Sequence, residues 1–374
     1  MNGRGDLQEI KEMLKDRAQE VCEKLLPNGR RDGNLYVSHD PVQGDYDHKP
    51  ALKVRLRGNI GGWEQFRGGA EGARKDILGL IEYVLRTDTK GALAWARDFL
   101  GLRSMSRQER EAMQMAASAK AKKRQKEDHD RRLWRIKKAD ELFSQRTMQI
   151  HPDRLDLPAL HHALSYFRGR DIPLEDVGYL PAETFRFSPQ TEWWNGAKFQ
   201  TEGARRFKVA PGPMFPAVHS AMRSQHGIVT ACHCTFLDPL QPVKAPVEPP
   251  KLIFGEASGA VVEVSCGYCC DPFWLARHAG TVIICEGVET ALSLAISAPE
   301  ARVWAGGSIT NMGNAPVWLD CVGAIILARD NNHGNPTAQK QIQQTIDKLE
   351  SWGKPLTVIN SHLGDDFNDL MKGE

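Results

Sequence analysis

Residues 281–293 read TVIICEGVETALS, and this stretch decides the predicted fold of the C-terminal part of the chain. Residues 281–285 are a short apolar run that is typical of a buried strand. Glu286 and Gly287 follow at the carboxyl end of that strand, and residues 289–297 have the apolar spacing of a helix. The stretch therefore predicts a strand, a turn and a helix in succession.

The same alternation continues toward the C-terminus. Apolar runs at 302–305, 321–328 and 356–359 predict three further strands, and residues 337–352 place apolar side chains on one helical face before Gly353. Strands that alternate with helices indicate a parallel sheet with right-handed crossovers. The predicted fold class is α/β.

Acidic side chains stand at the carboxyl ends of these strands, where open α/β sheets bind ligands. They are Glu286, Asp330 and the run DDFND at 365–369. A few carboxylate oxygens, completed by waters and substrate phosphates, form the shell that Mg²⁺ prefers, and such a site supports phosphoryl transfer. Acids after strands also cap helices, but three acidic clusters at one predicted sheet edge favour the metal site.

The composition excludes several classes of protein. With 374 residues, 41% hydrophobic and 26% charged, the chain is long enough for two or three domains. Its net charge of +2 excludes a uniformly basic nucleic-acid coat, although not a local basic patch. No apolar run approaches the ~20 residues of a membrane span, the N-terminus lacks the apolar region of a signal peptide, and eight cysteines make no disulfide scaffold at this length. We expect a soluble cytoplasmic protein with no membrane partner.

Residues 1–102 are predicted to form a small α+β module. Residues 6–26 have the pattern of an amphipathic helix, and 77–85 and 92–100 that of two shorter helices. Between them, apolar and basic side chains alternate as in a half-buried strand with a basic outer face. The apolar ones are Leu52, Val54 and Leu56, and the basic ones are Lys53, Arg55 and Arg57.

Residues 104–146 hold thirteen Lys or Arg against seven acids and almost no Gly or Pro. This composition predicts a long, exposed, basic helix or helical linker at 103–150. A solvated spacer and an arm that contacts nucleic acid both fit it. Beyond it, the composition is globular again, and we place a subdomain at 151–275 and the parallel-sheet domain at 276–374.

Two groups of cysteines have spacings that zinc sites use, CHC at 232–234 and CGYCC at 266–270. The first group lies in a strand pattern, so its two thiols share one face and His233 points to the other. Buried thiols are the favoured interpretation. Zinc is not expected.

Several runs resemble the Toprim domain of phage- and plasmid-type DNA primases. They are EGVETALS at 286–293, DNNHG at 330–334 and DDFNDL at 365–370, while HCTFL at 233–237 and PKLIFG at 250–255 resemble the stretches that precede that domain. The resemblance implies a Rossmann-like Toprim sheet flanked by helices at 276–374, after an α+β primase-core subdomain. The module at 1–102 is similar in outline to the primase zinc-binding domain, but Cys22 is its only cysteine, which excludes a zinc ribbon there.

The resemblance also implies roles for single residues. Glu286 would be the general base or acid and a metal ligand, and Asp330 the first acid of an Asp-x-Asp pair. Asn332 stands at the second position of that pair, which removes one negative charge but leaves a carbonyl oxygen for the metal. The affinity of the site for Mg²⁺ or Mn²⁺ would then be lower, unless Asp366 or Asp369 supplies the missing negative charge.

Basic side chains before the Toprim-like segment are candidates for binding a template strand or nucleotides, together with His233 and Asp369. They are Arg168, Arg170, Arg205, Arg206, Lys208 and Lys251. Contacts to phosphates give affinity without reading sequence. Trp193, Trp194 and Phe199 lie close by in sequence and suit the stacking of unpaired bases. A solvated face and a local aromatic cluster are the alternatives.

The implied function is a DNA primase of a mobile element, which joins nucleoside triphosphates into short primers on single-stranded DNA. No Gly-x-x-x-x-Gly-Lys-Ser/Thr loop occurs, so a replicative helicase or another replication protein would be a separate partner. A metal-dependent Toprim nuclease would use the same acids. The charge missing at Asn332 would also be consistent with a non-catalytic adaptor that binds single-stranded DNA and whose Toprim site has lost its activity.

Overall fold

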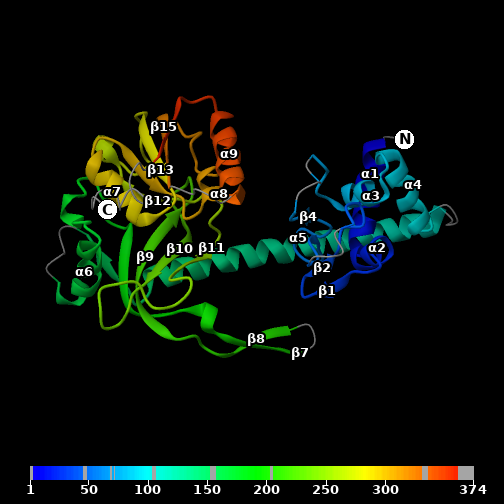
Figure 1. Cartoon of the computed structure of the whole chain (residues 1–374), viewed down its shortest axis with the longest axis horizontal. Coiled ribbons are helices and arrows are strands. Elements are labelled where there is room, and N and C mark those ends of the chain that lie inside the picture. The colour runs from blue at the N-terminus through cyan, green and yellow to red at the C-terminus, as the bar shows by residue number, and fades with distance from the viewer. Residues whose placement is uncertain are drawn as a thin grey trace. The chain divides into compact units, whose positions relative to one another are not determined.

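The computed structural model describes residues 3–44, 49–67, 70, 72–102, 107–151, 157–202, 205–330 and 336–360. The chain divides into two compact units, Met1–Arg131 and Arg132–Glu374. Figure 1 labels the elements of both. In the part of the chain that is described, no helix is both long enough and apolar enough to cross a membrane.

The first unit packs helices against a small antiparallel sheet. The helices are α1 (Gly3–Asp16), α2 (Ala18–Leu25), α3 (Ile77–Leu85) and α4 (Thr89–Phe99). The sheet has the order β1 (Arg30–Asp32), β2 (Leu35–Ser38), β3 (Leu52–Arg55) and β4 (Trp63–Gln65). Its core is built from the apolar positions of the predicted elements, with Ile10, Leu14, Val54 and Ile77 fully buried.

The prediction of a single helix at 6–26 is wrong, because the chain forms two helices that meet at Arg17. There the backbone leaves helical geometry, with φ −112° and ψ 25°. The Arg17 guanidinium pairs with Glu20 and lies 4.6 Å from the ring centroid of Phe99 in α4. The break lets α1 and α2 each bury an apolar face in the same core.

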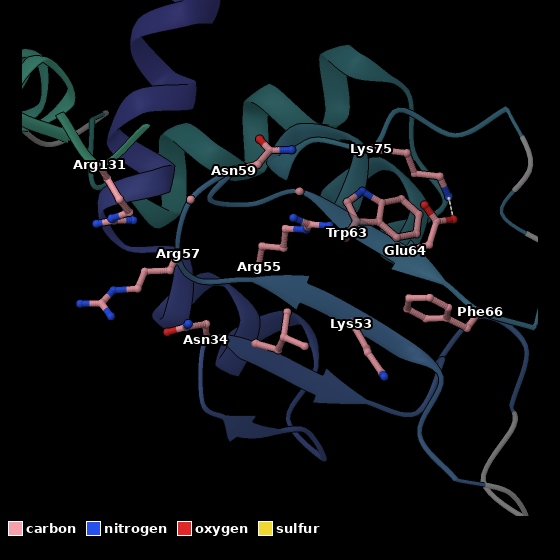
Figure 2. A pocket seen from close by; sticks show the side chains of 13 residues that line it. Asn34, Lys53, Arg55, Arg57, Asn59, Trp63, Glu64, Phe66, Lys75 and Arg131 are labelled. Carbon is pink, nitrogen blue, oxygen red and sulfur yellow. Dashed lines mark ion pairs between the residues drawn. The ribbon is translucent and has the colours of Figure 1, made fainter. Parts of the chain in front are cut away.

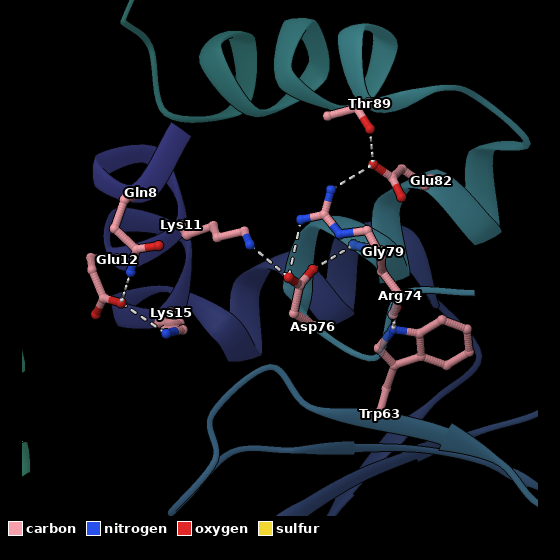
Figure 3. A network of polar contacts seen from close by, with 10 residues as sticks. All are labelled: Gln8, Lys11, Glu12, Lys15, Trp63, Arg74, Asp76, Gly79, Glu82 and Thr89. Carbon is pink, nitrogen blue, oxygen red and sulfur yellow. Dashed lines mark hydrogen bonds and ion pairs between the residues drawn. The ribbon is translucent and has the colours of Figure 1, made fainter. Parts of the chain in front are cut away.

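A polar network holds α1 against α3 (Figure 3). Asp76 caps α3 by accepting a hydrogen bond from the backbone N–H of Gly79 at 2.9 Å. Its carboxylate also accepts hydrogen bonds from Lys11 of α1 at 2.7 Å and from Arg74 at 3.1 Å. Burial alone would raise the pKa of Asp76, but these donors lower it to about 2. One carboxylate therefore serves both as a helix cap and as an interhelical contact.

The predicted basic helix is present as α5 (Arg107–Ser144), a single helix of 38 residues. In the first unit its Arg124 pairs with Asp16 of α1 at 2.5 Å. In the second unit its Arg135 donates a hydrogen bond to the carbonyl of Gly255 at 2.6 Å and pairs with Glu256 at 2.9 Å. Each part of the helix is thus held by ion pairs within its own unit.

The second unit begins with an antiparallel sheet of order β11-β10-β9-β6-β5. Its strands are β5 (Met148–Ile150), β6 (Phe185–Glu192), β9 (Met214–Arg223), β10 (Val229–Phe236) and β11 (Lys251–Gly255). Helix α6 (His161–Gly169) buries Leu164 and Phe167 in the same core as Phe185 of β6. A separate hairpin follows β6 and consists of β7 (Lys198–Glu202) and β8 (Arg205–Ala210).

A second sheet has the order β12-β14-β13-β15-β16. Its elements are β12 (Val262–Ser265), β13 (Gly280–Cys285), α7 (Val288–Ser297), β14 (Arg302–Ala305), α8 (Ile309–Met312), β15 (Val322–Arg329), α9 (Pro336–Glu350) and β16 (Leu356–Asn360). The strands from β14 to β16 are parallel, and α7 and α9 belong to the cores on opposite faces. The predicted α/β fold with a C-terminal parallel sheet is confirmed.

The edge strand β12 is antiparallel to β14 and lies in the segment before the predicted domain boundary at 275 and 276. Glu263 of β12 forms a buried ion pair with Arg302 of β14. The same carboxylate accepts hydrogen bonds from Trp304 Nε1 at 3.3 Å and from the backbone N–H of Phe273 at 3.1 Å. Because each polar group has a partner, the charge pair is accommodated in the interior.

Candidate active site

Glu286 and Asp330 follow the carboxyl ends of neighbouring parallel strands. Ile284 of β13 pairs with Leu327 of β15, so the two strands leave the sheet at the same edge and nearly the same level. The turn after β13 is held by backbone hydrogen bonds, in which the N–H of Gly307 donates to the carbonyl of Glu286 at 2.9 Å. The local order of strand, turn and helix thus places both acids where the sequence predicted a ligand site.

Both acids line a cavity of about 510 Å³ within the second unit. Cationic side chains from the antiparallel sheet, its loops and the end of α6 line the same cavity. The lining includes Arg170, His233, Lys244, Lys251, Ile253, Glu286, Gly287, Glu289, Thr290, Gly307 and Asp330. The wall is tight at Gly307, which has φ +74° and where a Cβ would lie 2.8 Å from Ile253. The cavity therefore joins acids of the parallel sheet to bases of the other sheet.

Glu289 anchors the basic side of this cavity. It lies in the first turn of α7, is almost fully buried, and pairs with Lys251 at 2.6 Å and with Lys244 at 3.7 Å. The hydroxyl of Tyr166 donates a further hydrogen bond to it at 2.6 Å. Burial would raise the pKa of Glu289, but the two ammonium groups and the hydrogen bonds hold it far below its usual range. Glu289 is therefore ionised and fixes the position of Lys251.

Glu286 has the opposite electrostatic setting. Burial raises the pKa of its carboxyl above the ordinary value, and the charge of Lys251 offsets only part of this. The two glutamates are three residues apart and differ because Lys251 pairs directly with Glu289. A carboxylate of raised basicity beside a paired one is the pattern of a general base next to a structural anion.

His233 reaches the same cavity from β10. It is 4% exposed, and its Nδ1 is buried without a hydrogen-bond partner in the described structure. Burial and the charge of Lys251 lower the pKa of His233 to about 4, so the ring is neutral at pH 7. His233 thus brings a neutral, buried ring to the lining of the cavity.

Two family models match the chain. The model for the Toprim domain matches residues 281–374, which begin at β13 and contain Glu286, Asp330 and the parallel strands described above. Residues 281–374 form a Toprim domain. A domain of unknown function matches residues 154–264, which include α6 and most of β12. No curated protein matches the chain significantly.

The chain is also similar to solved structures of primases, at low identity. The DnaG primase catalytic domain bound to single-stranded DNA is 13% identical with a TM-score of 0.40, and the match covers 60% of this chain and 73% of that one. A DNA primase domain from Pseudomonas aeruginosa is 15% identical with a TM-score of 0.39, over 59% and 71%. The primase fragment of the bacteriophage T7 primase-helicase is 13% identical with a TM-score of 0.34, over 56% and 70%. The family model, rather than these structures, identifies the Toprim domain.

The Toprim cavity suits a divalent cation with a phosphate ligand. Glu286 and Asp330 supply carboxylate oxygens, and Oδ1 of Asp330 is buried. Mg²⁺ is commonly held by one or two carboxylates and substrate phosphates rather than by a complete protein cage. The cations Arg170, Lys244 and Lys251 on the facing wall match the phosphates and not the metal.

The structure brings Arg170, His233 and Lys251 to the Toprim acids but not the other predicted bases that it describes. Arg168 is exposed and pairs with Glu175 at 3.3 Å. Lys208 lies in β8 and pairs with Glu192 at 2.8 Å. Arg205 and Arg206 belong to the same strand, β8, of the separate hairpin. The sequence reasoning grouped these residues because they are close along the chain, while the hairpin carries them onto a separate two-stranded sheet. Asn332, Asp366 and Asp369 lie outside the described residues.

The prediction of buried thiols is wrong for two cysteines of the second group, since Cys266 is buried but Cys269 is half-buried and Cys270 is exposed. None of these three belongs to the His/Cys group that the described residues form around Cys232.

Cys232 and Cys234 share one face of β10 with their sulfurs 3.7 Å apart, as the alternation predicted. His219 from β9 lies beside them, and its ligand atom is within 4.8 Å of both sulfurs. However, Nδ1 of His219 bonds to the carbonyl of Leu142 at 2.9 Å and Nε2 to Thr191 at 2.8 Å. Because both ring nitrogens have protein partners, this buried cluster fits a core better than a zinc site.

Sequence reasoning missed Tyr166, Lys244 and Glu289. Glu289 lies in the first turn of α7, three residues after Glu286, which stands in the turn between β13 and that helix. The available signal was a second acidic residue in the run EGVE directly after the predicted strand. Lys251 is 38 residues from Glu289 along the chain and Tyr166 is 123 residues away, so no local pattern revealed these pairs.

We expect His233 to make the folded state sensitive to acid. Its pKa is about 6.5 unfolded and about 4 folded, so its contribution to stability is complete above pH 6.5 and is lost as the pH falls toward 4. The loss at pH 5 is about 2 kcal/mol for one such group. His219 has the same lowered pKa of about 4. Urea unfolding at pH 7.5 and pH 5 measures how much the free energy of unfolding falls between these pH values. In His233→Gln this fall should be about half of that in the wild type.

The exposed His226 provides the control for this measurement. His226→Gln should lose as much stability between pH 7.5 and pH 5 as the wild type. An equal acid loss in His233→Gln and the wild type would show that His233 is not held neutral by the fold.

Proposed function

We propose that the Toprim domain and the antiparallel sheet before it act as a DNA primase. The enzyme would join ribonucleoside triphosphates into short primers on single-stranded DNA, in the replication of a phage or plasmid. The observation that carries the proposal is the cavity in which the strand-end acids Glu286 and Asp330 face Arg170, Lys244 and Lys251. Acids for a cation and bases for phosphates in one cavity are the two components that nucleotidyl transfer needs.

The proposed reaction assigns a role to each of these groups. The 3′-hydroxyl of the growing primer attacks the α-phosphorus of the incoming nucleotide, the bond to the β-phosphate breaks, and pyrophosphate leaves. Glu286, whose pKa is raised, accepts the hydroxyl proton. Lys251, held by Glu289, and Arg170 bind the triphosphate oxygens. A divalent cation held by Glu286 and Asp330 would neutralise charge on the phosphates and lower the pKa of the hydroxyl.

A groove near the hairpin is the proposed path of the template strand. It has a volume of about 640 Å³ and is lined by Trp134, Trp194, Phe199, Phe254, Lys138 and Lys208. Trp134 is 55% exposed and Phe199 is 43% exposed, so their rings are open to unpaired bases. Stacking on aromatic rings beside lysines is how sequence-independent binding of single strands works. A separate helicase or replication protein would deliver such a strand.

A direct assay tests the proposal. The full chain is incubated with single-stranded DNA, labelled ribonucleoside triphosphates and Mg²⁺ or Mn²⁺. Labelled oligonucleotides that grow with time support a primase. Shortened DNA without labelled product would indicate a Toprim nuclease instead, and a gel shift without either reaction would indicate an adaptor, the alternative that Asn332 favours.

Restoring the charge missing at position 332 tests the metal site separately. Asn332→Asp should raise primer synthesis at limiting Mg²⁺, because a carboxylate binds the cation more strongly than an amide oxygen. The effect should vanish at saturating Mg²⁺. The measurement is the rate as a function of Mg²⁺ concentration, and two superimposable curves would exclude position 332 from the metal site.

A further inference from the structure

Helix α6 carries three polar side chains at a spacing of four residues. They are His162, Tyr166 and Arg170, the last of which is the C-cap of the helix. Residues four apart lie on the same face of a helix, so these three form one polar row. The row leads to the cationic wall of the Toprim cavity, which consists of Arg170 itself, Lys244 and Lys251.

The middle residue of the row, Tyr166, reaches the cationic wall through Glu289. Its hydroxyl donates to Oε1 of that carboxylate at 2.6 Å, while Lys251 donates to Oε2 at 2.6 Å. Lys244 lies 3.7 Å from Oε1. Tyr166 is 2% exposed and is not among the described residues that line the cavity. It therefore cannot touch a ligand there, and it acts by fixing the carboxylate that holds both lysines.

The first residue of the row, His162, reaches the loop between β10 and β11. Its Nε2 donates a hydrogen bond to the backbone carbonyl of Asp238 at 2.8 Å, since a carbonyl only accepts. The Asp238 side chain in turn accepts hydrogen bonds from the backbone N–H groups of Leu240 and Gln241 at 2.8 and 3.0 Å. Lys244 follows in the same loop. The loop that carries this lysine is thus attached to α6.

We infer that α6 is the element that positions the cationic wall, with Tyr166 and His162 as its positioning residues. It supplies Arg170 itself and fixes Lys251 through Tyr166. It fixes the loop of Lys244 through His162. The three cations come from a helix, a loop and a strand, so a common anchor keeps their spacing matched to a chain of phosphates. The inference rests on the proposed function only in taking this wall as the triphosphate site.

Binding of phosphates to the full chain tests the inference without catalysis. The Kd values of ATP and of inorganic tripolyphosphate are measured with Mg²⁺ and without template. Tyr166→Phe should weaken both about tenfold, a typical cost of losing a hydrogen bond to a charged group. His162→Phe keeps a ring but removes the N–H, and should weaken both by less, because it loosens one lysine. The control is Tyr268→Phe, which changes a 64% exposed tyrosine of the second unit and should bind as the wild type does.

Acetylation by acetic anhydride, read by mass spectrometry after proteolysis, reports on Lys251 without any ligand. A lysine held by a carboxylate reacts slowly, so the rate at Lys251 should rise severalfold in Tyr166→Phe. The matched reference is Lys75 of the first unit, which pairs with Glu64 at 3.3 Å (Figure 2). Its side chain is 36% exposed, against 32% for Lys251. The rate at Lys75 should be the same in both proteins.

Unchanged affinity for ATP and tripolyphosphate in Tyr166→Phe would overturn the inference. Weaker binding with an unchanged rate of acetylation at Lys251 would overturn it too, because the hydroxyl would then act on stability and not on the position of the wall. Neither measurement uses a template or follows primer synthesis. A chain that fails as a primase can therefore still pass both tests, and an active primase can fail them.

Discussion

Glu286→Gln is expected to lower the rate of primer synthesis by ~10²–10⁴-fold, the usual cost of losing a general base. Gln keeps the size of the side chain but neither accepts the hydroxyl proton nor offers a charge to the cation. The fold should be retained, because burial already disfavours the charged form of Glu286. The measurement is the single-turnover rate of extension of a preformed primer at saturating Mg²⁺.

The matched control is Glu350→Gln, an exposed acid on α9 of the same Toprim domain. It should extend primers at the wild-type rate. The wild-type rate should also fall as the pH is lowered through the raised pKa of Glu286, since only the carboxylate is a base. Synthesis by Glu286→Gln within tenfold of the wild type would remove Glu286 from the role of base.

Lys251→Met is expected to lower the free energy of unfolding by ~2 kcal/mol at pH 7. Removing one partner of a fully buried ion pair costs about 3–5 kcal/mol. The cost is smaller here because Lys251 is 32% exposed and Lys244 remains 3.7 Å from Glu289. The double variant Lys251→Met/Glu289→Gln should recover part of the loss, because it leaves no unpaired buried carboxylate.

The pH dependence of this loss follows from the lowered pKa of Glu289. A carboxyl group with a lowered folded pKa contributes stability above its unfolded pKa of 4.5 and loses it as the pH falls below that value. The difference between Lys251→Met and the wild type should therefore narrow below pH 4.5. Urea unfolding at several pH values measures it, with the exposed Lys340→Met as the control. A constant difference down to pH 3 would contradict the role of Glu289.

The Toprim sheet could be predicted from the sequence because its buried strands appear there as continuous apolar runs. Strands β13, β14 and β15 lie within one residue of the predicted runs, since a parallel sheet covered by helices needs continuous apolar segments. Glu286 and Asp330 were found for the same reason, as the first acidic side chains after such runs. Here local sequence and tertiary environment agree.

Other parts escaped prediction because no local pattern encodes them. Strand β1 is exposed at every residue, so it has no apolar signature, and only its pairing with β2 defines it. The break at Arg17 depends on the packing of two helices. The pairing of Lys251 with Glu289 joins β11 of the antiparallel sheet to helix α7 of the Toprim domain. Such contacts are properties of the fold and not of a sequence window.

The edge strand β12 limits where this chain can be divided into independent domains. Three of its four residues lie within the segment matched by the domain of unknown function, yet it completes the sheet of the Toprim domain. A Toprim domain transplanted from residue 276 onward would leave β14 without its outer neighbour and Arg302 without Glu263. The two matched segments therefore share one folding unit, and a recombination that joined this Toprim domain to another protein would have to carry β12 with it.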